Sequence, residues 1–315
     1  MILKYVVKNI PNMGYKINDV LQKDLKISNR LLQFLITNKL IFYNDVLCDG
    51  IICDTRNLVK IGDIITVSMD YPEDNSNIVP TEMPLDILYE DEWLLILNKP
   101  SGIAIHPSIL HYSDSLSNGV RYYFDKIGLH KKIRPVNRLD FYTSGIVIFA
   151  KCAYIHEALS LQMKDGTFSK TYIAVVHGKL SKSEGTIDFP IGRKEGSIIE
   201  RCVDFENGQK SITNYSVVEY KDDIDCSVVE CHLVTGRTHQ IRVHFSSIGH
   251  PLVGDTLYGS NEDDFGADGQ MLHCCCMDFV HPVSGKKLQI GKKGRPFLPY
   301  WNFPYLFFPY WKFPY

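Results

Sequence analysis

The chain has 315 residues, of which 45% are hydrophobic and 22% are charged, and its formal net charge at pH 7 is -2. This composition is typical of a soluble globular protein with a sizeable core. It excludes a membrane span, because no apolar run approaches the ~20 residues that one requires, and it does not by itself indicate a polyanionic partner.

The cysteines and the start of the chain indicate a compartment. Nine cysteines are present without a C-x-x-C pair, and Cys274, Cys275 and Cys276 are adjacent, so they cannot all reach one metal from a regular strand or helix. Lys4 and Lys8 interrupt the apolar start that a secretory leader would need. We therefore expect reduced thiols in a cytoplasmic protein.

Residues 1–72 are predicted to form a small αβ module. Ser28 is a candidate helix N-cap, and the leucines that follow it in SNRLLQFLITNKL recur on one helical face. Two stretches typical of strands come next, IFYNDVLCDG and LVKIGDIITVSM, the second entered through a Gly-Asp turn. A segment rich in Pro, Asn and acidic residues then predicts a linker at residues 73–84.

Residues 85–295 are predicted to form a larger domain dominated by strands. The β-rich runs are LLILNKP, GIVIFAK, TYIAVVHGKL, SITNYSVVEY and CSVVECHLV. Two stretches have helical periodicity and stop at a glycine: YIHEALSLQMKDG at Gly166 and RTHQIRVHFSSIG at Gly249. Because strands outnumber helices without a regular βαβ alternation, we expect an α+β fold with a mainly antiparallel, mixed sheet and flanking helices.

Residues 296–315 form an aromatic, proline-rich tail. PYWNFPY at residues 299–305 recurs as PYWKFPY at residues 309–315, and five prolines exclude a continuous helix. The many aromatic residues are not typical of a disordered tail. We interpret the segment as a low-complexity extension, with docking on the body or on a partner as the alternative, and predict no chemical role for it.

Four segments in chain order carry the chemistry. They are LYEDEWLLILNKPSGIAIHP, RPVNRLDFYTSGIVIFAK, SKTYIAVVHGKL and LVTGRTHQIRVHFSSIGHPLVGDTLYG. Together they resemble the pseudouridine synthases of the large-ribosomal-subunit type, the RluA/RluD family, over residues 85 to about 290. Residues 1–72 resemble the alpha-L RNA-binding motif, the S-four-like fold. The resemblance implies a pseudouridine synthase catalytic domain preceded by a small RNA-binding domain.

The resemblance assigns catalysis to Asp140, Tyr172 and Arg242. Asp140, in the R-L-D-x-x-T-S-G loop, would act as a nucleophile, stabilise positive charge on the sugar or remove a sugar proton, and these three routes stay open. Arg242 would keep that carboxylate charged in a pocket without water. Tyr172 would stack on the uracil and accept the proton from carbon 5.

Several residues are candidate RNA contacts. Arg138 corresponds to the family arginine that fills the space left by the flipped base, and Arg237 is placed for phosphate or substrate contact. Thr143 belongs to the same loop as Asp140. A local basic cluster of the kind that binds polyanions is formed by Lys131, Lys132, Arg134 and Arg138.

The catalytic loop departs from the family pattern at three positions. Asn137 stands where many relatives have histidine, and we expect altered hydrogen bonding with retained activity. Phe141 and Tyr142 are bulky aromatic residues where charged or polar residues are common. They would either stack on RNA or pack inward.

No cofactor and no metal is expected. The rearrangement of uridine oxidises nothing and takes no group from a donor. Five histidines between residues 239 and 281 match no zinc spacing such as H-E-x-x-H; they are His239, His244, His250, His273 and His281.

The leading hypothesis is an isomerase that converts uridine to pseudouridine in structured RNA, with large-subunit ribosomal RNA as the expected substrate and transfer RNA as the alternative. A non-catalytic RNA-binding or ribosome-assembly protein of the same fold is disfavoured, because Asp140, Tyr172 and Arg242 are all present. Glycoside hydrolysis is disfavoured because it needs two carboxylates and the motifs provide one. We expect a cytoplasmic monomer that has no membrane partner.

Overall fold

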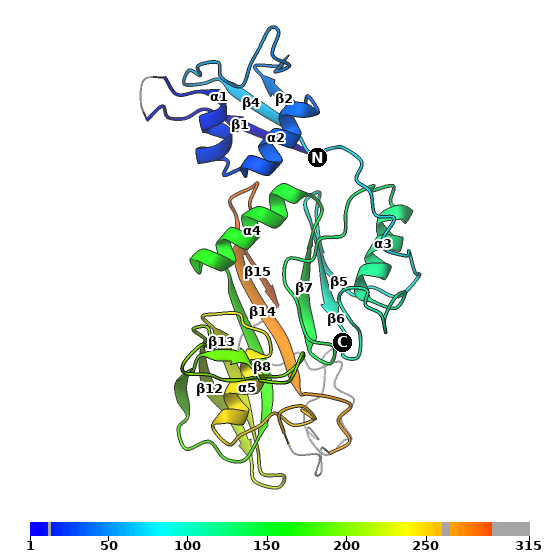
Figure 1. Cartoon of the computed structure of the whole chain (residues 1–315), viewed down its shortest axis with the longest axis vertical. Helices are drawn as coiled ribbons and strands as arrows, with labels where there is room; N and C mark the ends of the chain where they lie inside the picture. The colour runs from blue at the N-terminus through cyan, green and yellow to red at the C-terminus, as the bar shows by residue number, and fades with distance from the viewer. Residues whose placement is uncertain (12–13, 260–264, 292–315) are drawn as a thin grey trace.

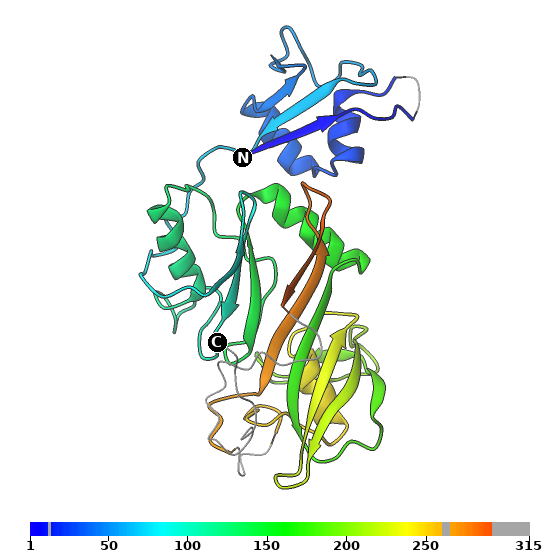
Figure 2. The ribbon, with the colours of Figure 1, turned by 180° about the vertical axis from the view of Figure 1, so that it is seen from behind.

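The computed structural model describes residues 1–11, 14–259 and 265–291. The predicted tail at residues 296–315 lies outside the described residues. Figure 1 shows the N-terminal part of the chain, in blue, at one end of a larger part that is rich in strands. Figure 2 shows the same arrangement from behind.

The N-terminal part is built on a four-stranded antiparallel sheet in the order β1-β4-β2-β3. The helix α2 begins as predicted, because the Ser28 hydroxyl accepts a hydrogen bond from the Leu31 N–H at 3.3 Å. Its elements are β1 (Ile2–Val6), α1 (Ile17–Asp19), a π-helical turn (Val20–Asp24), α2 (Asn29–Thr37), β2 (Ile41–Tyr43), β3 (Val46–Leu47) and β4 (Ile64–Ser68).

The large sheet has nine strands, in the order β5-β6-β7-β14-β8-β13-β12-β9 with β15 beside β14. All neighbouring pairs are antiparallel except β7 and β14, which are parallel. The predicted α+β class with a mainly antiparallel, mixed sheet is therefore confirmed. The strands are β5 (Ile87–Glu90), β6 (Leu94–Lys99), β7 (Ser144–Ala150), β8 (Ser169–His177), β9 (Glu184–Asp188), β12 (Ile212–Lys221), β13 (Cys226–Leu233), β14 (Leu272–Val280) and β15 (Lys287–Gly291).

Three helices accompany this sheet: α3 (Leu116–Lys126), α4 (Ala153–Asp165) and α5 (Gln240–Ser247). The helices α4 and α5 are the two that the periodicity predicts, and α4 stops where Gly166 adopts the left-handed conformation. The helix α3 is not predicted, because Gly119 interrupts its apolar pattern. The structure explains this glycine: a Cβ atom there would lie 2.4 Å from the Met83 side chain.

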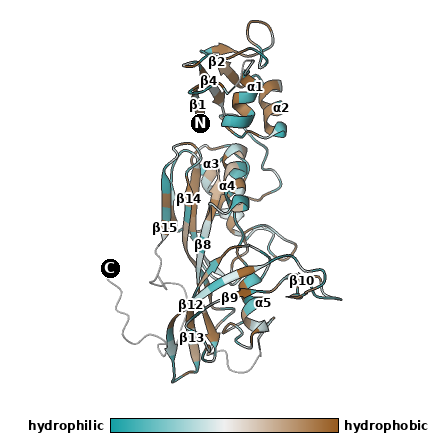
Figure 3. Ribbon diagram, turned by 90° about the vertical axis from the view of Figure 1, so that its left-hand side faces the viewer, coloured by the Kyte–Doolittle hydropathy of each residue, from teal (hydrophilic) through white to brown (hydrophobic). Residues whose placement is uncertain are grey.

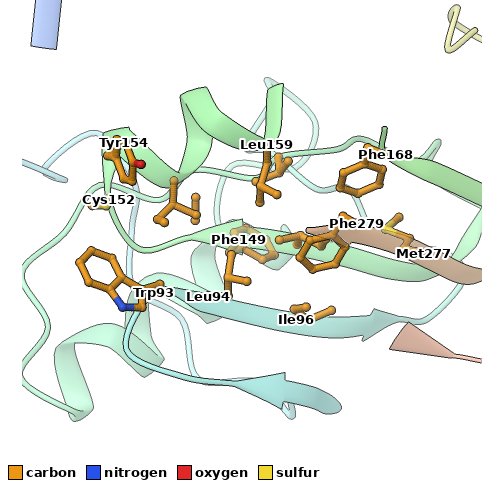
Figure 4. Close-up of a cluster of buried hydrophobic side chains, with 14 of the residues drawn as sticks. Trp93, Leu94, Ile96, Phe149, Cys152, Tyr154, Leu159, Phe168, Met277 and Phe279 are labelled. Carbon is orange, nitrogen blue, oxygen red and sulfur yellow. The ribbon is translucent and has the colours of Figure 1, made fainter. Parts of the chain in front are cut away.

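The core of the larger part lies between α4 and the central strands. Figure 4 shows Leu159 of α4 above Phe149 of β7, with Phe168 and Phe279 beside them. The last two rings are stacked at 5.3 Å between centroids. Every residue of β7 is buried, and Figure 3 shows hydrophobic residues along the strands of the sheet. This packing fixes the strand that directly follows the catalytic loop.

The strand β14 in the middle of the sheet is not predicted from the sequence. Its residues, LHCCCMDFV, are mainly Cys, His and Met, which favour strands less than β-branched or aromatic residues do. The three adjacent cysteines are buried within it, and none of them forms a disulfide within the described residues. In the described residues, no helix has the length and apolar character needed to cross a membrane.

Two residues of the basic cluster, Lys131 and Arg134, bind the start of the predicted linker and the residues just before it. Buried Lys131 donates hydrogen bonds to the carbonyls of Met69 and Tyr71, and its ammonium lies 4.4 Å from the centre of the Tyr71 ring. Arg134 forms a bidentate ion pair with the Glu73 carboxylate. Both cations are thus engaged within the chain.

Two further contacts join the N-terminal part to the larger part. The Ser28 hydroxyl donates a hydrogen bond to Glu157 of α4 at 2.9 Å. The amino group of Met1 pairs with Glu92 at 2.8 Å. The N-terminal part therefore lies against the α4 end of the larger part (Figure 1).

Candidate active site

The loop that carries Asp140 lies directly before β7. The Thr143 N–H donates to the Asp140 carbonyl at 3.1 Å, which closes the loop into a turn. The second residue of the strand, Gly145, has φ +111°, and a Cβ atom there would lie 2.3 Å from the Cys274 carbonyl oxygen of β14. The glycine of the T-S-G sequence is thus required for the close approach of β7 to β14.

Arg242 of α5 lies between two carboxylates. Its Nη1 atom donates to Oδ2 of Asp140 at 2.9 Å. Its Nε and Nη2 atoms donate to the two carboxylate oxygens of Asp255 at 2.7 and 2.8 Å. Asp255 is fully buried, whereas the Asp140 side chain is 27% exposed. The structure therefore brings Asp140 and Arg242 together as predicted and adds a second, buried acid behind the arginine.

The charges of this cluster are mutually stabilising. Burial alone would lower the pKa of Arg242, but the hydrogen bonds and charge of Asp255, followed by those of Asp140, outweigh burial and raise the pKa above its usual range. The guanidinium is therefore always charged, and a fixed cation stands beside Asp140.

His239 and Tyr258 complete the wall around Asp140. His239 precedes α5 in the left-handed conformation, and its Nε2 atom lies 3.8 Å from Oδ1 of Asp140. Its Nδ1 atom is hydrogen bonded to the Tyr258 hydroxyl at 2.8 Å. The Tyr258 ring lies 5.0 Å from the Arg242 guanidinium. Burial lowers the pKa of His239, and the charge of Asp140 partly opposes this.

One small pocket, of about 70 Å³, brings the predicted residues together. Its lining includes all three predicted catalytic residues and three of the candidate RNA contacts: Asp140, Tyr172, Arg242, Arg138, Thr143 and Arg237. Tyr172, on β8, is 6% exposed, and burial raises the pKa of its phenol well above the usual value. It therefore presents a neutral ring to the pocket.

The other three residues of the basic cluster, Lys131, Lys132 and Arg134, are not in this pocket. Lys131 binds two carbonyls just before the linker, and Arg134 pairs with Glu73 within it. This placement argues against the RNA contacts predicted for them. Lys132 is exposed, and its backbone N–H donates to Glu73 at 3.3 Å. Thr143 is buried, and its hydroxyl accepts a hydrogen bond from Gln270 at 3.0 Å.

The three unusual positions of the loop have defined partners. Asn137 is buried, and its side-chain amide pairs with the backbone of β7, donating to Ile146 and accepting from Ile148. It thereby holds the loop to the strand. Phe141 packs against His111, at 4.8 Å between ring centroids, and against Tyr142 edge to face.

Lys99, at the end of β6, is hydrogen bonded to the loop that carries Asp140. The sequence motifs do not indicate this residue. Its buried ammonium donates to the carbonyls of Pro100, Ile103 and Phe141 at 2.8 to 2.9 Å. Burial lowers its pKa to about 7, although the charge of Asp140 acts in the opposite direction. The lysine thus ties the residue after Asp140 to the end of a central strand.

Asp255, Tyr258 and His239 are also parts of the site that sequence reasoning missed. They lie in the quoted segment that begins LVTGRTHQIRVH, and the signal is an acid in GDTLYG soon after a helix rich in basic residues. The spacing of the histidines argues against a metal site, and no other role is predicted for His239. Within the described ranges, no group of three or more His, Cys, Asp or Glu side chains is arranged to hold a metal ion.

Comparisons with known proteins show which proteins this chain is similar to. The family model described as RNA pseudouridylate synthase matches residues 93–247. An uncharacterised RNA pseudouridine synthase of Bacillus subtilis, YjbO, is 40% identical over 266 residues, which cover 84% of this chain and 91% of that protein. Ribosomal large subunit pseudouridine synthase D of Zymomonas mobilis is 35% identical over 251 residues, which cover 76% and 78%. The solved structure of human RNA pseudouridylate synthase domain containing 1 superimposes with a TM-score of 0.58 at 29% identity, over 69% of this chain and 85% of that one.

Proposed function

We propose a substrate and a division of roles for this chain, which belongs to the RluA/RluD-type family of RNA pseudouridine synthases. The enzyme is an isomerase, and the proposed substrate is a uridine of large-subunit ribosomal RNA. Support comes from relatives named for the large ribosomal subunit, such as the Zymomonas mobilis protein at 35% identity. Transfer RNA is the alternative substrate.

The proposed catalytic role rests on the position of Asp140. Formation of pseudouridine breaks the bond between the sugar and nitrogen 1, makes a bond to carbon 5, and moves a proton from carbon 5 to nitrogen 1. The Asp140 carboxylate faces the pocket and is more exposed than Arg242, whose side chain is 8% exposed. The substrate would therefore meet the carboxylate, with the fixed cation behind it. Nucleophilic attack, charge stabilisation and removal of a sugar proton are all open to a group so placed.

Tyr172 is proposed to support the base and not to accept its proton. The raised pKa makes the phenolate costly, which argues against the predicted proton acceptance. An aromatic ring in the pocket wall can still stack on an extruded uracil. Arg138, which is exposed at the same pocket, is placed to fill the space that the extruded base leaves in the RNA.

The N-terminal residues 1–72 are proposed to act as an S-four-like RNA-binding domain. Support comes from the four-stranded sheet with its helices and from the contacts that fix it against α4. An RNA bound to both parts would reach from this domain along the larger part to Asp140. We propose a cytoplasmic monomer, because Asp140, Arg242 and Tyr172 come from one chain and none of the nine cysteines, all of them described, is in a disulfide.

Release of tritium from carbon 5 of uridine tests the proposal. Large-subunit ribosomal RNA and transfer RNA, each transcribed with uridine tritiated at carbon 5, would be incubated with the purified chain. We expect tritium release from the ribosomal RNA only. Release from transfer RNA alone would show that transfer RNA, and not ribosomal RNA, is the substrate. Binding without release from either RNA would support the non-catalytic hypothesis.

A further inference from the structure

A second, larger pocket opens beside the active site. Its volume is about 390 Å³, and it lies between the β10–β11 hairpin (Ile191–Arg193 and Arg201–Val203) and the turn that precedes α5. Three arginines from separate segments line it: Arg193, Arg201 and Arg237. Arg237 also lines the pocket that contains Asp140. The two pockets are therefore adjacent and share one cation.

The position of the hairpin is fixed relative to Asp140. The Arg201 N–H donates to the Tyr258 hydroxyl at 2.8 Å, and that hydroxyl is hydrogen bonded to His239, the neighbour of Asp140. At the other side of the hairpin, Ile191 and Gln209 exchange two backbone hydrogen bonds of 2.9 Å. Figure 3 shows the hairpin extending outward beside α5. A group bound there would be held at a defined place next to the catalytic carboxylate.

The pocket has an excess of positive charge. Within the described residues, no carboxylate lies within ion-pair distance of the Arg193, Arg201 or Arg237 side chains. Arg237 is exposed, and its Nε atom donates to the Lys210 carbonyl at 3.2 Å. Arg193 is exposed as well. The hydrogen bond of Arg237 to a neutral carbonyl leaves its charge uncompensated.

Two acids near the pocket, Asp204 and Glu200, have defined partners. Asp204 accepts hydrogen bonds from the backbone N–H groups of Glu206 and Asn207, at 3.0 and 2.9 Å. Glu200 pairs with Lys194 of the same hairpin at 2.8 Å, so this lysine is neutralised. Three arginines line the pocket, and the carboxylate of Asp204 lies beside its lining residue Gly192, so positive charge exceeds negative charge there.

We propose that this pocket binds a backbone phosphate of the substrate RNA, on a nucleotide that flanks the target uridine. This inference rests on the proposed function. Arginine suits the ligand, because its planar fork can donate two hydrogen bonds to phosphate oxygens. The volume is large enough for a nucleotide-sized group. Binding there would hold the RNA while the target base occupies the pocket of Asp140.

The salt dependence of RNA binding tests the inference. The affinity of the purified full chain for a large-subunit ribosomal RNA fragment would be measured from about 50 to about 300 mM KCl, a range that spans physiological salt. Wild type would be compared with Arg193→Gln, and Lys194→Gln serves as the matched control because it removes the same charge from the same hairpin outside the pocket. Loss of one phosphate contact should reduce the salt slope by about 0.7 to 0.9, and the affinity at ~0.1 M salt by about fivefold.

Arg193→Lys keeps the charge and should restore most of the slope. Equal slopes for Arg193→Gln and wild type, or equal losses for Arg193→Gln and Lys194→Gln, would overturn the inference. Thermal unfolding of each variant checks that the exposed side chain has been removed without loss of the fold. Tritium release by wild type on the same RNA is measured separately, so failure of the proposed function would be seen independently of the pocket.

Discussion

Asp255 receives two hydrogen bonds from Arg242, at 2.7 and 2.8 Å, and is itself fully buried. This pair fixes the plane of the guanidinium and leaves Nη1 directed at Asp140, 2.9 Å away. Asp255 thus fixes the orientation of Arg242, and Nη1 of Arg242 donates to Asp140. Asp255 is a positioning residue, because it touches Arg242 and does not line the pocket over Asp140.

Removing the charge of Asp255 should destabilise the protein more than removing that of Asp140. Asp255→Asn leaves a buried guanidinium without its main partner, and we expect the free energy of unfolding to fall by about 3 kcal/mol. Asp140→Asn should cost less, because that carboxylate is 27% exposed. Urea unfolding of both variants measures the difference. Equal losses would contradict this account of the cluster.

Tyr172 should tolerate loss of its hydroxyl but not of its ring. Tyr172→Phe keeps the aromatic face, and because the buried phenol stays neutral, we expect kcat/KM to remain within about tenfold of wild type. Tyr172→Ala removes a stacking surface worth about 1–3 kcal/mol, so kcat/KM should fall roughly 5- to 150-fold. Tritium release under single-turnover conditions gives both values. Equal losses in the two variants would instead give the hydroxyl a direct role.

His273 should make the fold sensitive to acid. Burial lowers its pKa from 6.5 to about 4, so the unfolded chain binds this proton at a higher pH than the folded chain does. Stability from this group is therefore fully present above about pH 6.5 and is lost as the pH falls towards about 4. Between about pH 7 and pH 5 the loss should be about 2 kcal/mol.

Urea unfolding of wild type and His273→Gln at both pH values isolates this contribution. Wild type should lose more stability than the variant by about that amount. The same dependence on pH in both proteins would show that His273 does not titrate in this way. The side chain is hydrogen bonded to Ser144 at 2.9 Å, so its protonation would act at the start of β7.

Substitution of Arg134 and substitution of Arg138 should have different effects on linker cleavage and RNA affinity, although the two residues lie close together in the sequence. Arg134→Gln breaks the ion pair with Glu73, so the linker should be cleaved faster by a protease while RNA affinity stays unchanged. Arg138→Gln removes an exposed cation from the active-site pocket, so RNA affinity or tritium release should fall with no change in cleavage. Limited proteolysis and RNA binding on both variants would distinguish them. A loss of RNA affinity in Arg134→Gln would restore the original prediction for that residue.

The elements and residues that depend on local pattern could be predicted from the sequence. The cap at Ser28, the stop at Gly166 and the strand-rich larger part follow from short-range rules of conformation. The convergence of Asp140 and Arg242 came from a family resemblance, since residues 102 positions apart have no local signal of contact. Domain boundaries and catalytic roles remain predictions.

The features that could not be predicted depend on tertiary packing. The glycine inside α3 is explained only by the Met83 side chain against it. Lys131 has the pattern of a surface cation, and its burial depends on two carbonyls of a distant segment. Asp255 and Lys99 act through Arg242 and the carbonyl of Phe141, so their partners could not be inferred from the residues around them.

Pseudouridine mapping of cellular RNA tests the central claim most directly. Total RNA from cells that express wild type or Asp140→Asn would be treated with a carbodiimide and analysed by reverse transcription, with Asp114→Asn, an exposed acid paired with His111, as the matched control. The account predicts a stop in large-subunit ribosomal RNA that is present with wild type and Asp114→Asn and absent with Asp140→Asn. Identical maps for all three, with each protein folded and expressed, would contradict it.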